Sequence, residues 1–249
     1  MSGTLVVVGG SGGVGFAIAA RARANGRAVA VVARTADRLE QLAQEIGAHA
    51  FVADATDLES MQACLERIGD ECGPIEGYAH AVGSVVLRPL HALTLDEWNR
   101  TLTINATSAF VGLKSILPIM MKQRAGSIVL FSSVAVQTGL ANHEAIAAAK
   151  GAIEGIVRSA AISYARYGIR INAIAPALTR TPLSKNLWAS DAMLAASVAM
   201  HPLGRIGEPA DIAAAALFAL SDDAAWMSGQ IIGIDGALSA GVSPPRAKL

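Results

Sequence analysis

Short apolar runs alternate with segments of helical spacing along most of the chain. These short apolar runs predict strands at Leu5–Val8, Ala28–Ala33, His49–Val52, Ile75–His80, Ser127–Phe131, Ile169–Ala175 and Gln230–Ile234. Helical spacing predicts helices between them, for example over Gly13–Asn25, Leu58–Gly69 and Leu95–Met121. Strands that alternate with helices in this way are typical of a parallel sheet covered on both faces. The pattern therefore predicts an α/β fold.

One segment near the C-terminus breaks this alternation. Ala177–Gly207 shows no regular pattern and contains two prolines. A long irregular insertion in a regular α/β domain is more often a substrate lid than a linker. We therefore predict one domain over residues 1–249 with a substrate lid at about 177–207, and we expect the tail Ser243–Leu249 to be irregular.

Composition and charge narrow the classes of function. The 249-residue chain is 53% hydrophobic and only 4% aromatic, which suits parallel strands and closely packed helices better than a β-sandwich. Twenty basic residues balance twenty acidic ones, so no nucleic-acid or membrane-surface partner is indicated. Cys64 and Cys72 lack CxxC spacing and a nearby histidine pattern, so we interpret both as reduced thiols and predict no metal site.

The N-terminal segment does not have the pattern of a secretory signal. Its first apolar run follows no basic region and passes at once into glycines. No uninterrupted apolar run approaches membrane-spanning length. We therefore expect a cytoplasmic protein without a membrane partner.

A glycine-rich turn, Gly9-Gly-Ser-Gly-Gly13-Val-Gly15, joins the first predicted strand to the first predicted helix. Glycine allows the backbone to approach a pyrophosphate closely, and the start of a helix offers free N–H groups and a positive dipole. A turn in this setting predicts a dinucleotide site. Its cofactor-binding residues are predicted to be Gly9, Ser11, Gly13, Val14 and Gly15.

The spacing of these glycines resembles the TGxxxGxG loop of the short-chain dehydrogenase/reductase family, with Val8 in place of the threonine. Other motifs follow in the family's order. Val52-Ala-Asp54 resembles the strand-end aspartate that touches the adenine, and His80-Ala-Val-Gly83 resembles the NNAG strand end without its two asparagines. Pro176-Ala-Leu-Thr-Arg-Thr181 resembles the PGxxxT turn, and Gly204–Pro209 and Ser228–Gly236 resemble the C-terminal signatures.

This resemblance covers nearly the whole chain and implies both the fold and further cofactor contacts. The implied fold is a Rossmann-type, doubly wound parallel sheet of about seven strands with helices on both faces. The residues that the resemblance adds to the expected cofactor site are Asp54, Ala55, Ala81, Gly83, Lys150, Pro176, Leu178 and Thr181.

The second predicted strand indicates which cofactor is preferred. It ends at Val32-Ala33-Arg34, with no carboxylate where the adenosine ribose should lie. An acidic group there would repel a 2′-phosphate, whereas an arginine attracts it. We therefore predict NADP(H) over NAD(H); alternatively, Arg34 is only a solvated charge at the end of a strand.

The resemblance also implies catalytic residues, with one exception. Ser133 corresponds to the serine that holds the substrate oxygen, Lys150 to the lysine that binds the nicotinamide ribose, and Asn105 to the asparagine that holds a water molecule. The family's tyrosine, four residues before the lysine, corresponds to Ile146, which carries no proton. Loss of a positioned general acid typically costs on the order of 10²- to 10⁴-fold in rate.

Three interpretations of this gap stay open. In the first, His143 supplies the proton: positions 143, 146 and 150 share one helix face, and His143–Lys150 has the YxxxxxxK spacing of the related enoyl-thioester reductases. A histidine at a helix start can equally act as a cap or contact solvent. In the second, the proton comes from Ser133, from water on Asn105 or from the substrate's surroundings. In the third, the protein binds NADP(H) as a sensor or scaffold and turnover is impaired.

The sequence favours the enzyme, since Asn105, Ser133 and Lys150 are all retained. The predicted activity is NADP(H)-dependent hydride transfer to or from a small apolar carbonyl/alcohol or enoyl-type substrate, whose identity the sequence does not give. The helix after His143 is apolar nearly all round, and Gly151 and Gly155 would let another helix approach closely. Tetramers of the family resembled here pack through the corresponding helix. We therefore predict a homotetramer, with a dimer as the second possibility.

Overall fold

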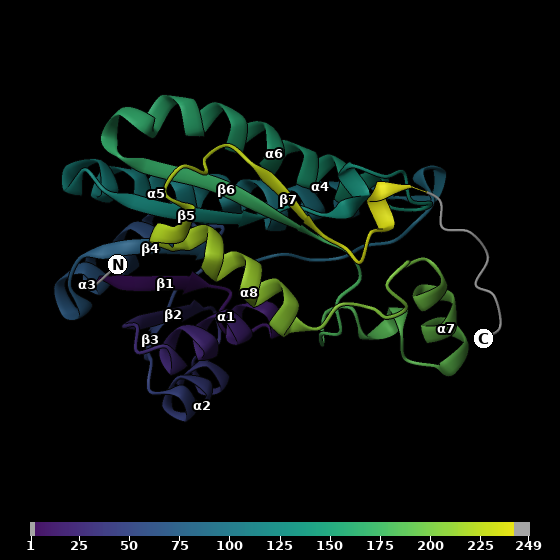
Figure 1. Cartoon of the computed structure of the whole chain (residues 1–249), viewed down its shortest axis with the longest axis horizontal. Coiled ribbons are helices and arrows are strands. Elements are labelled where there is room, and N and C mark those ends of the chain that lie inside the picture. The colour runs from purple at the N-terminus through teal and green to yellow at the C-terminus, as the bar shows by residue number, and fades with distance from the viewer. Residues whose placement is uncertain (1–2, 242–249) are drawn as a thin grey trace.

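The computed structural model describes residues 3–241, and within this part of the chain seven strands form one parallel sheet (Figure 1). The strands are β1 (Thr4–Val8), β2 (Val29–Ala33), β3 (His49–Val52), β4 (Ile75–His80), β5 (Gly126–Phe131), β6 (Ile169–Pro176) and β7 (Ile231–Ile234). Their order across the sheet is β3-β2-β1-β4-β5-β6-β7, and every neighbouring pair is parallel. The predicted Rossmann-type sheet is confirmed, with strand ends within one residue of those expected.

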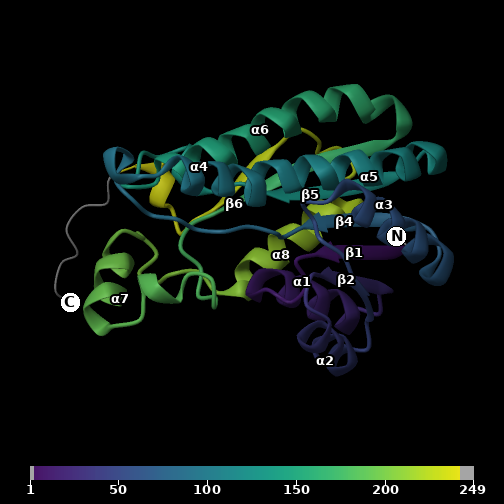
Figure 2. The same ribbon diagram turned by 180° about the vertical axis from the view of Figure 1, so that it is seen from behind.

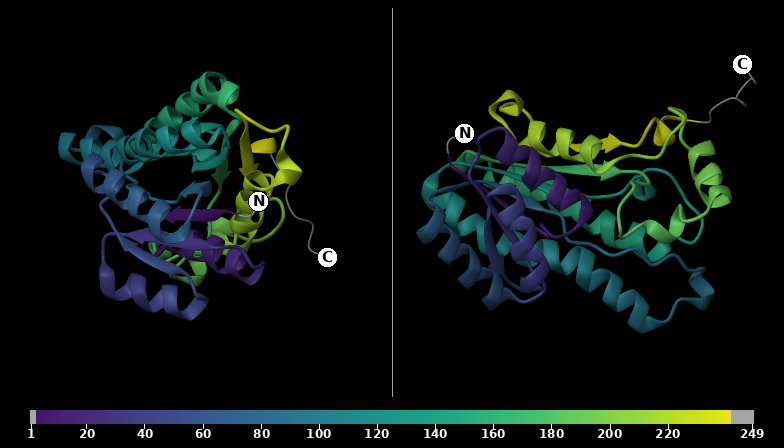
Figure 3. Two further views of the ribbon diagram at one scale, coloured as in Figure 1. Left: turned by 90° about the vertical axis from the view of Figure 1, so that its left-hand side faces the viewer. Right: turned by 90° about the horizontal axis from the view of Figure 1, so that it is seen from below.

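Helices cover both faces of the sheet, as Figures 2 and 3 show from behind, from the side and from below. On one face, α3 (Leu58–Cys72), α5 (Ser108–Gln123) and α6 (Glu144–Tyr164) bury side chains such as Leu65, Ile116 and Ile153. On the other face lie α1 (Gly13–Ala24), α2 (Ala36–Ile46) and α8 (Pro209–Leu220). Because both faces are covered, the strands are apolar on both sides, which is why they read as continuous apolar runs.

The helix predicted over Leu95–Met121 is interrupted by a wider turn. The structure has α4 (Leu95–Leu102), a π-helical turn at Thr103–Thr107, and then α5. By length and composition alone the stretch Leu95–Gln123 would suit a membrane span, but 56% of its apolar window is buried in the fold. It therefore has the character of a core helix.

The chain order of the strands reverses between β1 and β4, and in folds of this type ligands bind beyond the carboxyl ends of the strands at such a point. Residues 177–207, predicted to form the lid, connect β6 to α8 at this end of the sheet (Figure 1). They are less irregular than expected, because they contain a 3-10 turn (Lys185–Leu187) and α7 (Asp191–Ala199). The tail Ser243–Leu249 lies outside the described residues.

Candidate active site

One cavity of about 680 Å³ lies at the carboxyl ends of the strands. It is lined by every residue that the sequence predicted for the cofactor and for catalysis, although they come from many separate segments. These are Gly9, Ser11, Gly13, Val14, Gly15, Arg34, Asp54, Ala55, Ala81, Gly83, Asn105, Ser133, His143, Lys150, Pro176, Leu178 and Thr181.

The turn between β1 and α1 requires glycine at particular positions. Gly9 has a φ of +82°, which favours glycine, and a Cβ there would lie 2.7 Å from the carbonyl oxygen of Ala81. A Cβ at Gly15 would lie 2.2 Å from the carbonyl oxygen of Gly9. Helix α1 then begins after Gly12, which has no side chain to cap the first N–H groups, and its first turn contains no acidic residue. The turn therefore leaves a helix N-terminus open to an anion on the cavity side.

The same cavity is also lined by one basic and one acidic side chain, each of which follows a strand. Arg34 follows β2 and is exposed. Asp54 follows β3 and accepts hydrogen bonds from the backbone N–H of Thr56 at 2.9 Å and from its hydroxyl at 2.8 Å. These two bonds, ahead of the charge of Arg34, hold the pKa of Asp54 below its usual value. The carboxylate is thus fixed in place and ionised.

Asn105 lies in the π-helical turn and is fully buried. Its amide nitrogen donates to the carbonyl oxygen of Thr101 at 2.9 Å and to the hydroxyl of Ser84 at 3.0 Å. Its amide oxygen accepts from the backbone N–H of Ser84 at 3.2 Å. Ser84, which also lines the cavity, was not singled out from the sequence, although it directly follows the recognised Gly83.

Lys150 and Ile146 face the cavity from the same side of α6, one turn apart. Lys150 is only 7% exposed, and burial lowers the pKa of its ammonium group from 10.5 to about 8. Ile146 is buried to a similar degree and offers no polar atom. A Cβ at Gly83 would lie 3.0 Å from the amide oxygen of Asn105 and 3.5 Å from the Lys150 amine, so Gly83 packs closely against Asn105.

Ser133 lies at the end of β5, on the cavity wall. Its hydroxyl oxygen accepts a hydrogen bond of 3.2 Å from the backbone N–H of Ala135. This bond uses a lone pair of the hydroxyl and leaves its proton available to a substrate oxygen.

His143 occupies the cap position before α6 rather than a position inside the helix. Its Nδ1 atom lies 2.7 Å from the carbonyl oxygen of Ala141. A carbonyl can only accept, so Nδ1 carries a proton, and in the neutral ring Nε2 has the free lone pair. His143, Ile146 and Lys150 nevertheless line the same cavity, as their spacing predicted.

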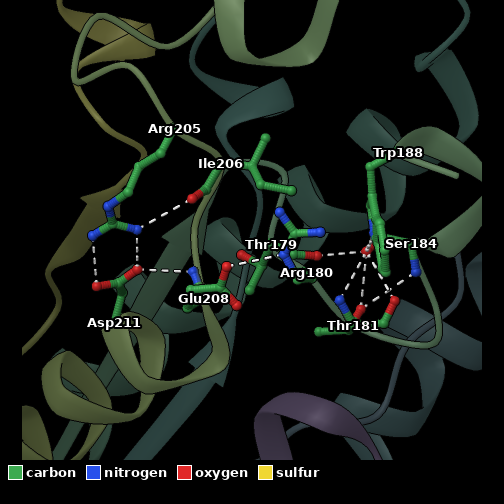
Figure 4. Close-up of polar contacts among 9 residues, drawn as sticks. All are labelled: Thr179, Arg180, Thr181, Ser184, Trp188, Arg205, Ile206, Glu208 and Asp211. Carbon is green, nitrogen blue, oxygen red and sulfur yellow. Dashed lines mark hydrogen bonds and ion pairs between the residues drawn. The ribbon is translucent and has the colours of Figure 1, made fainter. Parts of the chain in front are cut away.

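A polar cluster at the base of residues 177–207 was also missed (Figure 4). The hydroxyl of Ser184 bonds the carbonyl oxygen of Thr179 and accepts from the Trp188 indole at 3.2 Å. Arg180 stacks over the Trp188 ring at 4.7 Å and pairs with Glu208 at 3.0 Å. The partners are separated in sequence by up to 28 residues, and no local pattern marks such pairs.

Several proteins of known sequence and structure are similar to this chain. Residues 9–239 match the family described as Enoyl-(Acyl carrier protein) reductase. The Inactive 2-(S)-hydroxypropyl-CoM dehydrogenase 2 of Xanthobacter autotrophicus is 35% identical, over 86% of this chain and 96% of that protein. Levodione reductase of Leifsonia aquatica is 33% identical, over 95% and 94%. A crystal structure of levodione reductase has a TM-score of 0.91 at 32% identity and covers 96% of this chain and 98% of its own.

Proposed function

Because the chain belongs to the short-chain dehydrogenase/reductase family, we propose that it is an oxidoreductase that transfers hydride between NADP(H) and a small apolar substrate. The substrate is a carbonyl/alcohol pair or an enoyl compound. The observation that carries the proposal is the convergence of Asn105, Ser133, His143 and Lys150 on the cavity that also contains the glycine turn.

The residues that line the cavity support a dinucleotide as the cofactor. The first turn of α1 presents N–H groups for the pyrophosphate, and the missing side chains at Gly9 and Gly13 allow close approach. Arg34 supports NADP(H) over NAD(H), because its exposed guanidinium at the end of β2 would attract a 2′-phosphate. Asp54 would hold the adenine end, and Lys150 would donate to the ribose hydroxyls at the other end.

The residues at the reacting end of the cavity would have the following roles. The Ser133 hydroxyl donates to the substrate oxygen, and the Lys150 ammonium stabilises negative charge there. Asn105 holds the Ser84 loop against the π turn. His143 would carry the transferred proton at Nε2 in its doubly protonated form, because Nδ1 keeps its own proton on the carbonyl of Ala141.

An enoyl-type substrate suits this set of groups best. Reduction of a carbonyl needs a proton at oxygen, and Ile146 has none to give at the position where the family resemblance places a tyrosine. In an enoyl compound the charge that develops is that of an enolate, which Ser133 and Lys150 can stabilise until His143 or water supplies the proton that completes the reduction.

The second candidate is an NADP(H)-binding sensor or scaffold with impaired turnover. Ile146 at the reacting end favours it, as does similarity to a relative whose name contains the word inactive. The retention of Ser133 as well as Lys150 argues against it, since a protein that only binds the cofactor has little use for the hydroxyl.

The deciding experiment measures NADPH oxidation with a panel of ketones, quinones and enoyl thioesters, for the parent and for His143→Ala. We expect turnover with at least one compound, and a loss on the order of 10²- to 10⁴-fold in His143→Ala with unchanged NADPH affinity. His91→Ala is the matched control, because His91 is exposed and does not line the cavity. Equal turnover in parent and His143→Ala removes His143 from the mechanism, and no turnover with any compound favours the sensor.

The remaining features follow the same family assignment. We propose one domain over residues 1–249, in which residues 177–207 close over the substrate, and a cytoplasmic location. We also propose a homotetramer, with a dimer as the alternative. The outer face of α6 supports assembly, since Gly155, Ile156 and Ala160 line a shallow hollow there and Ile162 is 82% exposed.

A further inference from the structure

A hydrogen-bonded chain of three buried side chains lies beneath the active site and has no place in the mechanism above. Tyr78 and His80 point to the same face of β4, and Ser108 begins α5. The Tyr78 hydroxyl lies 3.0 Å from Nδ1 of His80, and Nε2 of His80 lies 3.0 Å from the Ser108 hydroxyl. Ser108 in turn bonds the carbonyl oxygen of Ile104 at 2.6 Å.

The direction of every bond in this chain can be assigned. The carbonyl of Ile104 can only accept, so the single proton of the Ser108 hydroxyl points to it. His80 must then donate to Ser108 from Nε2, which leaves Nδ1 as the acceptor for the Tyr78 hydroxyl. The hydrogen bonds run from Tyr78 to His80 to Ser108 to Ile104, and every N–H and O–H donor of these three side chains is used.

His80 stays neutral in this position. Burial, together with the charge of Lys150, lowers its pKa to about 3, and burial raises that of the Tyr78 hydroxyl far above its usual value. A proton relay needs groups that titrate near the working pH. The chain is therefore a fixed support.

These hydrogen bonds of Tyr78, His80 and Ser108 support the π-helical turn that contains Asn105. In this turn the backbone N–H of Ser108 bonds the carbonyl of Thr103, and side-chain donors take two other carbonyls: Asn105 bonds that of Thr101, and Ser108 bonds that of Ile104. A π turn inside a helix is rare and frequently marks a functional site. The Ser108 hydroxyl therefore helps to hold the wider turn.

The end of β4 is joined to this turn at two points. His80 bonds Ser108 on one side, and four residues later Ser84 bonds both polar atoms of Asn105. The loop between these two points contains Ala81 and Gly83 of the cavity wall. Close packing leaves little freedom here, because a Cβ at Gly112 would lie 2.2 Å from the Tyr78 hydroxyl and 2.9 Å from Nδ1 of His80.

We propose that His80 and Ser108 are positioning residues. They hold Asn105 and the loop at Ser84 in the relative position that the reaction needs. The proposal rests on the proposed function, because it concerns the geometry of the same site. Neither side chain belongs to the cavity wall, so both act through the π turn.

The test compares Ser108→Ala with Ser115→Ala. Ser115 is a matched control because it is buried in the same helix and its hydroxyl makes the same kind of bond, to the carbonyl of Val111 at 2.9 Å. Three quantities are measured for each variant: kcat, the Kd for NADPH, and amide hydrogen exchange of Ser84 and of residues 101–108. Both variants lose one hydrogen bond from a hydroxyl to the carbonyl four residues earlier, but only Ser108→Ala also breaks the link to His80.

We expect Ser108→Ala to lower kcat by about tenfold or more, because small misplacements of an active-site group are costly. The Kd for NADPH should stay within about twofold of the parent's, since the phosphate and ribose contacts are elsewhere. Hydrogen exchange should be faster at Ser84 and in the π turn, and Ser115→Ala should match the parent in all three measurements.

Two results would overturn the proposal: parental kcat and exchange in Ser108→Ala, or the same loss of kcat in Ser115→Ala. The exchange measurement also separates this proposal from the proposed function. If the parent turns over no substrate, the proposed function fails, while faster exchange in Ser108→Ala alone still supports the link. Equal exchange in the two variants refutes it.

Discussion

The hydroxyl of Ser132 donates a 2.8 Å hydrogen bond to the carboxylate of Glu154, and both side chains are buried. Ser132 precedes Ser133 at the end of β5, and Glu154 lies one turn after Lys150 on α6. The bond therefore fixes the strand that carries the active-site hydroxyl against the helix that carries the amine. Arg158 holds the other carboxylate oxygen at 3.0 Å.

Ser132→Ala should lower the free energy of unfolding by about 1–3 kcal/mol, because it removes one partner of a buried carboxylate. Urea denaturation of the cofactor-free protein measures this change. Ser163→Ala, which removes an exposed hydroxyl bonded to the Ser159 carbonyl on the same helix, should change stability by no more than about 0.5 kcal/mol. Equal effects in the two variants would mean that the Ser132–Glu154 bond contributes nothing specific.

Ile146→Tyr should increase turnover of ketone substrates by at least about tenfold, because it places a phenol one turn before Lys150 where the structure has a hydrocarbon. Ile146→Phe is the control, since it adds nearly the same volume without the hydroxyl. Both variants bring the same strain from a larger side chain, about 1–3 kcal/mol. NADPH oxidation with a ketone panel gives the comparison, and similar rates for the two variants would contradict the prediction.

The fold was predictable because each strand and helix is marked by a pattern of residues that are close together in the sequence. Strands β1 and β2 are runs of mostly apolar, β-branched residues, and burial of both sheet faces makes such runs continuous. The cavity residues were predictable for a related reason. Glycine at Gly9 and Gly15 is required by backbone geometry, so the motif has few alternatives.

Other features were not predictable because they depend on contacts between distant segments. The π turn leaves the apolar spacing of Leu95–Met121 almost unchanged, so periodicity alone gave one continuous helix. The hydrogen bond between His80 and Ser108 joins β4 to α5 across 28 residues, and no local pattern relates the two positions. The structure places His143 on the cavity wall and at the cap position, which the sequence had offered as the alternative to a place on the helix face.

Arg34→Asp should weaken NADPH binding by about tenfold or more and strengthen NADH binding. An aspartate would repel the 2′-phosphate and accept hydrogen bonds from the ribose hydroxyls instead. Kd values for both reduced cofactors, from fluorescence titration, provide the measurement. Arg38→Asp makes the same charge change at an exposed position outside the cavity wall and should leave the ratio of the two Kd values near the parent's. If the parent already binds NADH more tightly, the assignment of Arg34 is wrong.

Lys150→Met should abolish turnover but stabilise the cofactor-free protein at pH 7. Burial lowers the pKa of Lys150 from 10.5 to about 8, so the folded state holds its proton less tightly than the unfolded state. The burial of the charged Lys150 therefore lowers the free energy of unfolding. This loss of stability is fully present below pH 8 and disappears as the pH rises toward 10.5. The difference between these pKa values corresponds to about 3 kcal/mol, which is an upper bound for the gain.

Urea denaturation of parent and Lys150→Met at pH 7 and pH 10 measures this gain, which should be larger at pH 7. Lys122→Met, at an exposed lysine in the last turn of α5, should change stability by less than about 1 kcal/mol. A loss of stability in Lys150→Met at pH 7 would show that contacts of the ammonium group outweigh its burial. A gain would show that the site keeps an unfavourable charge because the reaction needs it.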